Sequence, residues 1–353
     1  MKENVYFIKS DGLDEQGLSL KILKTISEHG LLDFISKNDM TAVKTHFGEA
    51  AGNGFVRPIH IKTIGAEIKK KGALPFITET STLYKGNRSN AVSHIHLANK
   101  HGFGYENTGL PIIMADGLFG DEETEIEING RIYKSVNVAK AIAAAQSMVV
   151  FSHFTGHLAA GFGAALKNLG MGCTSRKAKL IQHSTARPSI KVSKCTLCGQ
   201  CEKWCPAGAI TLNEKSAVIK NSKCIGCGQC LAVCRFDSVG YNWGATYEDL
   251  QKKVVEHAMG VALPKKNKIL FINFLTRISK DCDCMTSFEK ICDDIGVLLS
   301  FDPVAIDASS LDLVEKYTGR KFSELSFDIP YKFQIDYSRE IGFGNPDYEL
   351  IEV

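Results

Sequence analysis

"CTLCGQCEKWCP" spans residues 195–206, and "CIGCGQCLAVCR" repeats its pattern at residues 224–235. Each cysteine of the first run has a counterpart at the same offset in the second run, so the two runs are an internal duplication. The spacing C-x2-C-x2-C-x3-C places three thiolates on a tight loop and a fourth in the helical turn that follows. This pattern is typical of the ligands of a [4Fe–4S] cluster.

The duplication also predicts how the ligands divide between two clusters. In two-cluster ferredoxins, the fourth cysteine of each run binds the cluster of the other run. The predicted ligands are Cys195, Cys198, Cys201 and Cys234 for the first cluster, and Cys224, Cys227, Cys230 and Cys205 for the second. Zinc ribbons pair two C-x2-C hooks at longer separation, and disulfide frameworks belong to small secreted domains, so both alternatives fit these runs less well.

Composition limits the classes of protein to which the chain could belong. Its 353 residues suffice for about two domains, and 44% apolar residues suffice for a full core. The net charge of +3, from 42 basic and 39 acidic groups, gives no indication of a nucleic-acid groove or a membrane surface. The first residues do not resemble a signal peptide, and no run of 18 apolar residues occurs. We therefore expect a soluble, cytoplasmic protein.

Outside the cysteine runs, apolar segments typical of strands alternate with segments of helical periodicity. The expected strands are 4–9, 40–47, 74–80, 110–117, 148–154 and 268–276, and the expected helices are 19–35, 57–72, 89–103 and 135–146. Residues 116–136 suggest an antiparallel excursion that turns at Asn129 and Gly130. This alternation predicts an α/β fold with a largely parallel sheet and helices on both faces.

The cysteine runs interrupt this pattern, which resumes after them. We therefore predict a host α/β domain in two parts, residues 1–189 and 242–353, with an inserted α+β ferredoxin domain at residues 190–241. A small fold with adjacent termini can be inserted in this way without separating the halves of its host.

Several long segments outside the cysteine runs resemble one known family. They include "AVKTHFGEAAGNGFVRP", "TETSTLYKGNRSNAVSHIHLANKHGF", "GAALKNLGMGCTSRKAKLIQHS" and "CDCMTSFEKICDDIGVLLSFDPVAIDASSLDLV". These segments resemble the uncharacterised iron–sulfur centre proteins of anaerobic microbes, classed as domain of unknown function 362. The resemblance covers residues from about 4 to about 320 and implies a host domain plus a ferredoxin, but no particular reaction. Arg235 departs from the proline that such a run usually carries, as at Pro206 in the first run.

The first candidate site in the host domain follows the strand expected at residues 40–47. Lys44, His46 and Arg57 bracket the loop "FGEAAGNGF". Ligands of open α/β sheets bind beyond the carboxyl ends of the strands, where these residues would supply positive charge. The alternative is an ordinary tight turn between strand and helix. Arg88, in the polar segment "STLYKGNR", is a further candidate for binding an anion or substrate.

The second candidate site is "SHFTGHLAAGFGAALKN", residues 152–168. Gly156, Gly161 and Gly163 follow a strand, and a helix is expected to begin near residue 164 with Lys167 in its first turns. Backbone amides at a helix start favour an anion, although small residues could equally serve close packing of the helix on the sheet. His153 and His157 flank the glycines and could act as acid, base or metal ligand. Our candidate catalytic residues are His153, Lys167 and His46.

Four cysteines remain outside the two runs: Cys173, Cys282, Cys284 and Cys292. Four thiolates are a complete tetrahedral ligand set, which suits an iron–sulfur centre or zinc. We expect a third metal site here, preferably an iron–sulfur centre that would tie the two parts of the host domain together. Buried, reduced thiols in the core are the alternative.

Two classes of function remain open. In the first, the chain is an iron–sulfur redox protein that carries electrons to a substrate, a cofactor or a third metal centre in the host domain, and a ferredoxin-type reductase would combine these parts. Its partner would be a redox protein or a small-molecule substrate. In the second, the host domain is an acid–base enzyme, an isomerase or hydrolase, and the clusters are structural. A fold-level analogy with the amino-terminal part of nickel-dependent lactate racemases favours the second class only weakly.

Overall fold

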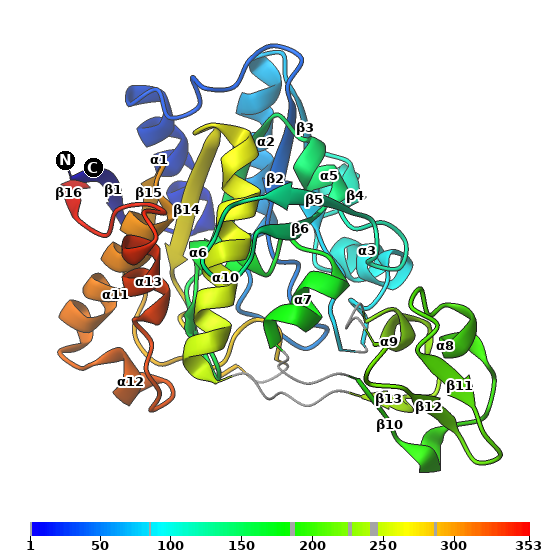
Figure 1. Cartoon of the computed structure of the whole chain (residues 1–353). Coiled ribbons are helices and arrows are strands. Elements are labelled where there is room, and N and C mark those ends of the chain that lie inside the picture. The colour runs from blue at the N-terminus through cyan, green and yellow to red at the C-terminus, as the bar shows by residue number, and fades with distance from the viewer. Residues whose placement is uncertain (1, 85, 184–187, 225–227, 241–245, 286–287) are drawn as a thin grey trace.

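The fold is built on one large sheet of the α/β type. The computed structural model describes residues 2–84, 86–183, 188–224, 228–240, 246–285 and 288–353. Among these residues, eight strands form the sheet in the order β16-β1-β15-β14-β7-β2-β3-β4 (Figure 1). Their bounds are β1 Glu3–Lys9, β2 Met40–Lys44, β3 Leu74–Glu79, β4 Ile112–Met114, β7 Ser147–His153, β14 Ile269–Leu275, β15 Gly296–Ser300 and β16 Tyr348–Glu352.

The sheet is mostly parallel, as predicted. From β14 to β4 all neighbouring strands run in parallel, and β16 is parallel to β1. Only β15 runs antiparallel to both of its neighbours in this sheet. The carboxyl ends of β14, β7, β2 and β3 therefore meet at one edge of the sheet.

Helices cover both faces of the sheet (Figure 1). One face is covered by α1 Glu15–Glu28, α2 Pro58–Lys70 and α3 Ala91–Lys100, with the short α4 Tyr105–Thr108 packed on α2. The other face is covered by α5 Lys140–Ala144, α6 Ala165–Gly170, α10 Tyr247–Ala262, α11 Pro303–Thr318, α12 Phe322–Leu325 and α13 Phe333–Glu340, with the 3-10 turn η2 Leu263–Lys265 after α10.

Strand β7 shows why both faces must be covered. Met148 and Val150 belong to the core on one face, and Val149 and Phe151 belong to the core on the other. All four side chains are fully buried. Burying each such side chain stabilises the fold by about 1.5–3 kcal/mol, so an unbroken apolar run predicts a central strand rather than an edge strand.

The antiparallel excursion is confirmed, with one correction to its boundary. β5 Glu123–Glu127 pairs with β6 Ser135–Ala139, and Asn129 in the turn has a positive φ of 50°. We predicted a helix over 135–146, but it begins only at Lys140. Residues 135–139 form a strand instead of a helix because Val136 and Val138 are buried on one side of the hairpin.

The cysteine-rich segment forms a lobe at one end of the molecule (Figure 1). β10 Ser189–Ile190 pairs with β13 Val239–Gly240, so the two ends of the segment lie side by side. Between them lie η1 Val192–Lys194, α8 Gln200–Lys203, β11 Ile210–Leu212, β12 Ala217–Ile219 and α9 Gln229–Val233. The lobe has an apolar cluster of its own, which includes Cys201, Cys230 and Cys234.

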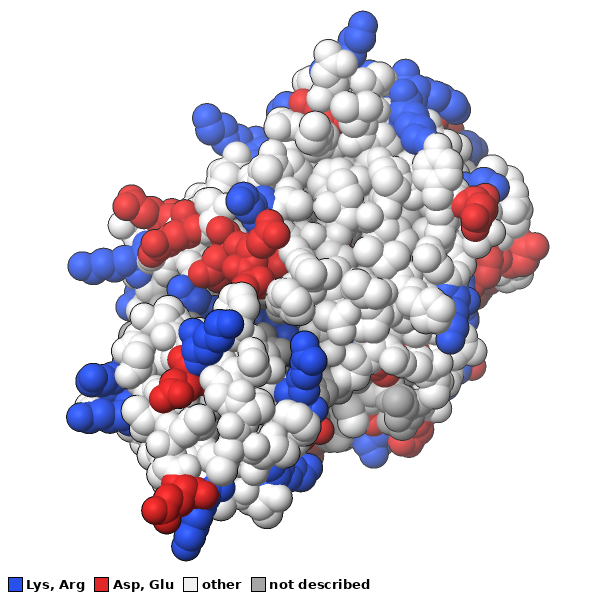
Figure 2. Space-filling view, turned by 90° about the vertical axis from the view of Figure 1, so that its right-hand side faces the viewer, with Lys and Arg blue, Asp and Glu red and all other residues white. Residues whose placement is uncertain are grey.

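The surface on the side of this lobe carries charges of both signs. Figure 2 shows both basic and acidic side chains on the described part of that face, around a wide area of uncharged residues. This distribution agrees with the near balance of charges in the sequence.

Among the described residues, we find no helix of the length and apolarity that a membrane span requires.

Candidate functional site

A cavity of about 670 Å³ lies at the sheet edge where the parallel strands end. Its walls come from the segments that follow β2, β3, β7 and β14, and from α6 and the helix α7 Arg176–His183. The ionisable side chains that line it are His46, Glu79, Tyr84, Arg88, His153, His157, Lys167, Lys179, His183, Tyr247, Asp281 and Asp283. The three predicted catalytic residues, His46, His153 and Lys167, are therefore brought together, as is Arg88.

A buried ion pair underlies this cavity. Lys44 Nζ lies 2.5 Å from Glu79 Oε1 and also donates to Asn168 Oδ1 at 2.7 Å. Burial alone would raise the pKa of Glu79, but the charges of Lys44 and its neighbours lower it. Glu79 is thus held as a carboxylate, and Lys44 is fully occupied by protein acceptors.

Arg88 and His46 form a second contact network in the cavity wall. Arg88 Nε donates to Glu49 Oε2 at 3.1 Å, and Arg88 Nη1 lies 2.6 Å from His46 Nε2. The other ring nitrogen of His46 accepts from the Gly48 amide at 3.0 Å. Burial, assisted by the charge of Arg88, lowers the pKa of His46 well below its ordinary value. A neutral imidazole accepts at only one nitrogen, so one of these two donors is left with a weaker contact.

Lys167 differs from the other cations of the cavity. It projects from α6, and among the described residues its Nζ donates no hydrogen bond to a protein acceptor. Burial lowers its pKa to about 8, although Asp283 opposes the shift. At neutral pH the side chain is mostly an ammonium group without an acceptor, and a small rise in pH converts it to a free amine. This group could bind an anion or transfer a proton.

Lys179 and His183 bring α7 into the cavity wall. Lys179 Nζ donates to Thr80 Oγ1 at 2.5 Å, to the Ser81 carbonyl at 2.8 Å and to the Thr174 carbonyl at 2.9 Å. Burial lowers the pKa of Lys179 to about 8 and that of His183 to about 3. Neither residue was predicted from the sequence, because both lie on a helix rather than at a strand end.

His153, at the end of β7, positions the loop that follows β14. Its Nε2 donates to the Thr276 carbonyl at 2.8 Å, and its Nδ1 lies 2.9 Å from Asp283 Oδ1. Both ring nitrogens are therefore engaged by the protein. This contact fixes Asp283, and with it the two cysteines on either side, at the cavity wall.

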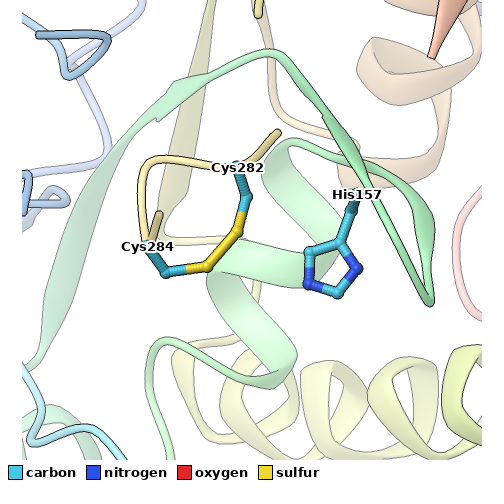
Figure 3. A group of neighbouring side chains, drawn as sticks. All are labelled: His157, Cys282 and Cys284. Atoms are coloured by element: carbon cyan, nitrogen blue, oxygen red, sulfur yellow. A yellow bond between two sulfur atoms is a disulfide. The ribbon is translucent and has the colours of Figure 1, made fainter. Parts of the chain in front are cut away.

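His157, Cys282 and Cys284 meet inside the cavity (Figure 3). The two cysteines are joined by a disulfide, and one ring nitrogen of His157 and both sulfurs lie within 4.8 Å of one another. His157 Nδ1 accepts from the amides of Ala159 and Ala160, at 3.1 and 2.9 Å. Burial lowers the pKa of His157 well below its usual value, so the ring is neutral and carries its proton on Nε2.

The predicted anion site needs correction. Lys44 is committed to Glu79, and Arg57 bonds to Asn53 Oδ1 at 2.6 Å and is not among the residues that line the cavity. The amides at the start of α6, those of Ala165 and Leu166, already donate to the carboxyl oxygens of the protein's own Asp307, at 2.9 and 2.8 Å.

The glycines of the same segment serve mainly close packing. A Cβ on Gly156 would lie 2.0 Å from the Lys280 carbonyl, and one on Gly161 would lie 2.3 Å from the Tyr331 side chain. Of the three glycines only Gly163 lines the cavity. Gly161 also has a φ of 79°, which few other residues adopt.

The predicted third metal site is not assembled as a set of four cysteines. Cys173 is buried in the core beneath the sheet, and Cys292 packs against the edge of the same core. Within the described residues, neither joins Cys282 and Cys284 in a group of metal-binding geometry. The prediction rested on the count of four cysteines outside the two runs, and a count carries no information on where the residues lie in the fold.

In the lobe, the described cysteines converge in two places. Cys201 and Cys234 belong to the same buried cluster, and burial raises the pKa of Cys201, with a smaller contribution in the same direction from Cys198 and Cys234. A second, small cavity is lined by Cys205, Cys224 and Cys230. Cys227 lies outside the described residues.

Backbone amides point at several of these sulfurs. The Ala217 amide donates to Cys195 Sγ at 3.3 Å, and the Ala209 amide donates to Cys205 Sγ at 3.2 Å. Burial opposes ionisation of Cys234, but a hydrogen bond with Ser238 and several backbone amides lower the pKa of this thiol. The contacts of Cys234 favour its thiolate, the form in which cysteine binds a metal.

The lobe contacts the host domain at α7. Gly228, at the start of α9, faces the Leu180 side chain, since a Cβ built on Gly228 would lie 3.2 Å from Leu180 Cδ2. Beside it, Gln229 Nε2 donates to Asp121 Oδ2 at 3.0 Å. Among the described residues, the second cysteine run thus touches the helix that lines the cavity.

Comparisons with solved structures give distant likenesses. The lactate racemase apoprotein from Thermoanaerobacterium thermosaccharolyticum is similar at 11% identity with a TM-score of 0.44, over 83% of this chain and 53% of that one. A crystal structure of a Thermotoga maritima protein is similar at 10% identity with a TM-score of 0.42, over 91% of this chain and 60% of that one. The chain thus spans between half and two thirds of the length of these two proteins.

No curated protein matches the chain. A family model does, over residues 41–312, which is more than half of the sequence. The chain therefore belongs to the family described as Domain of unknown function (DUF362).

Proposed function

We propose that this chain is an iron–sulfur redox protein in which a two-cluster ferredoxin lobe delivers electrons to a substrate bound in the host cavity. The proposed ligands are Cys195, Cys198, Cys201 and Cys234 for one [4Fe–4S] cluster, and Cys205, Cys224, Cys227 and Cys230 for the other. Such clusters supply one-electron transfer. The proposed ferredoxin segment is residues 190–241, inserted between the host segments 1–189 and 242–353.

The residues of the lobe fit these clusters. The grouping of Cys198, Cys201 and Cys234 combines two cysteines of the first run with the last of the second. The small cavity combines Cys205, the last of the first run, with Cys224 and Cys230 of the second. This exchange of the fourth ligand is the arrangement that the sequence repeat predicts.

The observation that carries the proposal is the position of α7. This helix contacts the second cysteine run through Leu180, and it lines the cavity through Lys179 and His183. A single helix thus lies between the ligands of the second proposed cluster and the cavity. A packed protein path of this kind is what electron transfer between two sites requires, whereas a purely structural lobe would have no need to touch the cavity wall.

The charge of Lys167 favours an anionic substrate. Lys44 is neutralised by Glu79, and Arg88 is paired with Glu49. Lys167 remains without a hydrogen-bonded acceptor among the described residues, and its Nζ can bond a carboxylate or phosphate oxygen. The cavity volume of about 670 Å³ is suited to a small molecule.

The competing function is acid–base catalysis with structural clusters. Its support is Lys167, whose pKa of about 8 allows it to exchange a proton near neutral pH, close to the neutral ring of His157. The two functions differ in the behaviour of the reduced protein. In the redox function, electrons taken up by the lobe pass to a substrate, whereas in the acid–base function they remain on the lobe.

The experiment is anaerobic purification of the full chain, analysis of iron and acid-labile sulfide, and EPR of the reduced protein. We expect about eight irons per chain, and a Cys224→Ser variant that loses the signal of one cluster and keeps the other. Cys292→Ser, which changes a cysteine outside both runs, is the matched control. Absence of iron from protein purified without oxygen, or an unchanged spectrum in Cys224→Ser, would refute the ligand assignment.

The electron-transfer part of the proposal has its own test. Candidate anionic acceptors are added to the reduced protein, and the return of the cluster absorbance is followed in wild type and in Lys167→Met. An acceptor that reoxidises the wild type faster than the variant supports the proposal. If Lys167 variants abolish an isomerase or hydrolase activity that is indifferent to cluster reduction, the acid–base function is correct instead.

A further inference from the structure

We propose that Cys282 and Cys284 are a redox couple, a disulfide in the cavity wall that takes up the electrons entering through the cysteine lobe before they reach the substrate. This inference rests on the proposed function and names the group in the host domain at which the electrons arrive. It replaces the third metal centre that the count of cysteines suggested.

The two sulfurs are presented to the cavity by a loop held in place through other atoms. His153 binds the Asp283 carboxylate between the two cysteines, and the Tyr84 hydroxyl lies 3.3 Å from the Cys284 carbonyl. Ser326 Oγ donates to the Lys280 carbonyl at 3.0 Å, just before the pair. None of these contacts uses a sulfur atom, so the disulfide can open and close while the loop keeps its position.

The bond has little to contribute as a structural crosslink. The stabilisation that a disulfide gives grows with the length of the chain that it closes, and residues 282 and 284 are only two positions apart. The contacts of Asp283 and Cys284 already fix the same loop. The pair also lines the cavity instead of joining two elements of the core. Its location therefore favours a chemical role.

His157, which lies beside Cys282 and Cys284, argues against a metal ion at this place. A histidine that binds a metal normally donates its other ring N–H to a carboxylate or carbonyl. His157 Nδ1 instead accepts from the amides of Ala159 and Ala160, which leaves the proton on Nε2. The ring thus offers an N–H, and not a lone pair, to the sulfurs of Cys282 and Cys284 (Figure 3). An N–H beside sulfur stabilises a thiolate.

The chemistry balances with groups already named. The disulfide accepts two electrons and two protons, its sulfur–sulfur bond breaks, and two thiols form. The electrons come singly from an external low-potential one-electron donor, through the lobe. The Lys167 ammonium, which interacts with Asp283 between the two cysteines, can supply one proton, and water can supply the other. Transfer of two electrons and two protons to the bound substrate restores the disulfide.

The test counts electrons and locates thiols in the full chain with its clusters. Anaerobic protein is titrated with reduced methyl viologen, then treated with N-ethylmaleimide and analysed by peptide mass spectrometry. We expect Cys282 and Cys284 to be alkylated only after reduction. The double variant Cys282→Ser with Cys284→Ser should keep both cluster signals and take up about two electrons fewer than wild type. Cys292→Ser, a cysteine outside the pair, should take up as many as wild type.

Dependence on the lobe is tested with Cys224→Ser. Under the same titration, this variant should keep Cys282 and Cys284 as a disulfide for much longer than wild type does. If the clusters of wild type are reduced while the pair stays unalkylated, or the double variant takes up as many electrons as wild type, the inference is wrong and the proposed function stands. Metal that is bound beyond the two clusters and lost in the double variant would also overturn it. Protein without clusters would overturn both proposals together.

Discussion

The buried ion pair of Lys44 and Glu79 allows a quantitative prediction about the free energy of unfolding. Lys44 and Glu79 are 0% and 4% exposed, and their charged atoms are 2.5 Å apart. At an effective dielectric constant of about 20, two unit charges at this distance attract each other by about 7 kcal/mol. Lys44→Met removes the cation and leaves the Glu79 carboxylate buried.

The neighbours of Glu79 can replace only part of this attraction. Arg88 Nη1 is 3.8 Å from Glu79 and already paired with Glu49. His94 lies 3.9 Å away, but burial lowers its pKa to about 3, so it is neutral near pH 7. Because breaking a buried pair from one side costs about 3–5 kcal/mol, we expect Lys44→Met to lower the free energy of unfolding by that amount.

Urea denaturation followed by far-UV circular dichroism measures this loss. The double variant Lys44→Met with Glu79→Gln buries no unpaired charge and should recover most of the stability, to within about 2 kcal/mol of wild type. Lys71→Met is the matched control, because Lys71 pairs with the exposed Asp33 at 2.8 Å and should cost less than about 1 kcal/mol. A Lys44→Met variant no less stable than the control, or one that Glu79→Gln destabilises further, would refute the reasoning.

Three further predictions follow from single contacts. Lys167, whose pKa burial lowers to about 8, should react with succinic anhydride with half-maximal rate near pH 8, which peptide mass spectrometry of the modified chain measures. Burial raises the pKa of Asp307 to about 7, so between pH 4 and pH 7 the folded protein holds a proton that the unfolded chain has released. The free energy of unfolding should therefore fall by about 1.4 kcal/mol for each unit by which the pH rises in this range. Asp307→Asn should remove that part of the slope in urea denaturation at several pH values. Gly170→Ala should lower the melting temperature strongly, because its Cβ would lie 2.0 Å from the Val254 carbonyl where α6 crosses α10.

The sheet could be predicted from the sequence where strands are buried on both faces. The apolar runs at 148–154 and 268–276 match β7 and β14 closely, because such strands can have no polar side and so stand out from helices. β15 and β16 were missed. β15 is an antiparallel strand that enters the sheet between β1 and β14. β16 at the sheet edge has exposed and half-buried side chains, with no clear apolar pattern.

The residues of the candidate site could be predicted where they come at or just after the end of a strand. His46 and His153 were found because they come just after β2 and at the end of β7, and parallel strands bring their carboxyl ends to one edge. Lys179 and His183 reach the same cavity from α7, and no strand precedes them. Their positions depend on how α7 packs between the sheet and the lobe, and the pattern of residues 176–183 alone does not contain that information.

Asp307 shows why a motif does not specify its ligand. The sequence predicts an anion at the start of the helix near residue 164, and the structure instead places there the carboxyl group of Asp307, a side chain of α11 more than a hundred residues away in sequence. The same two amides would bond a substrate carboxylate equally well. Asn273 also donates to Asp307, at 2.8 Å, so the carboxylate joins β14, α6 and α11 beneath the cavity. The position left for an external anion is consequently the one beside Lys167, where no protein acceptor reaches among the described residues. The two amides at the start of α6 are satisfied by a group of the protein itself, whereas the Lys167 ammonium has no hydrogen-bonded acceptor among the described residues and so marks the site.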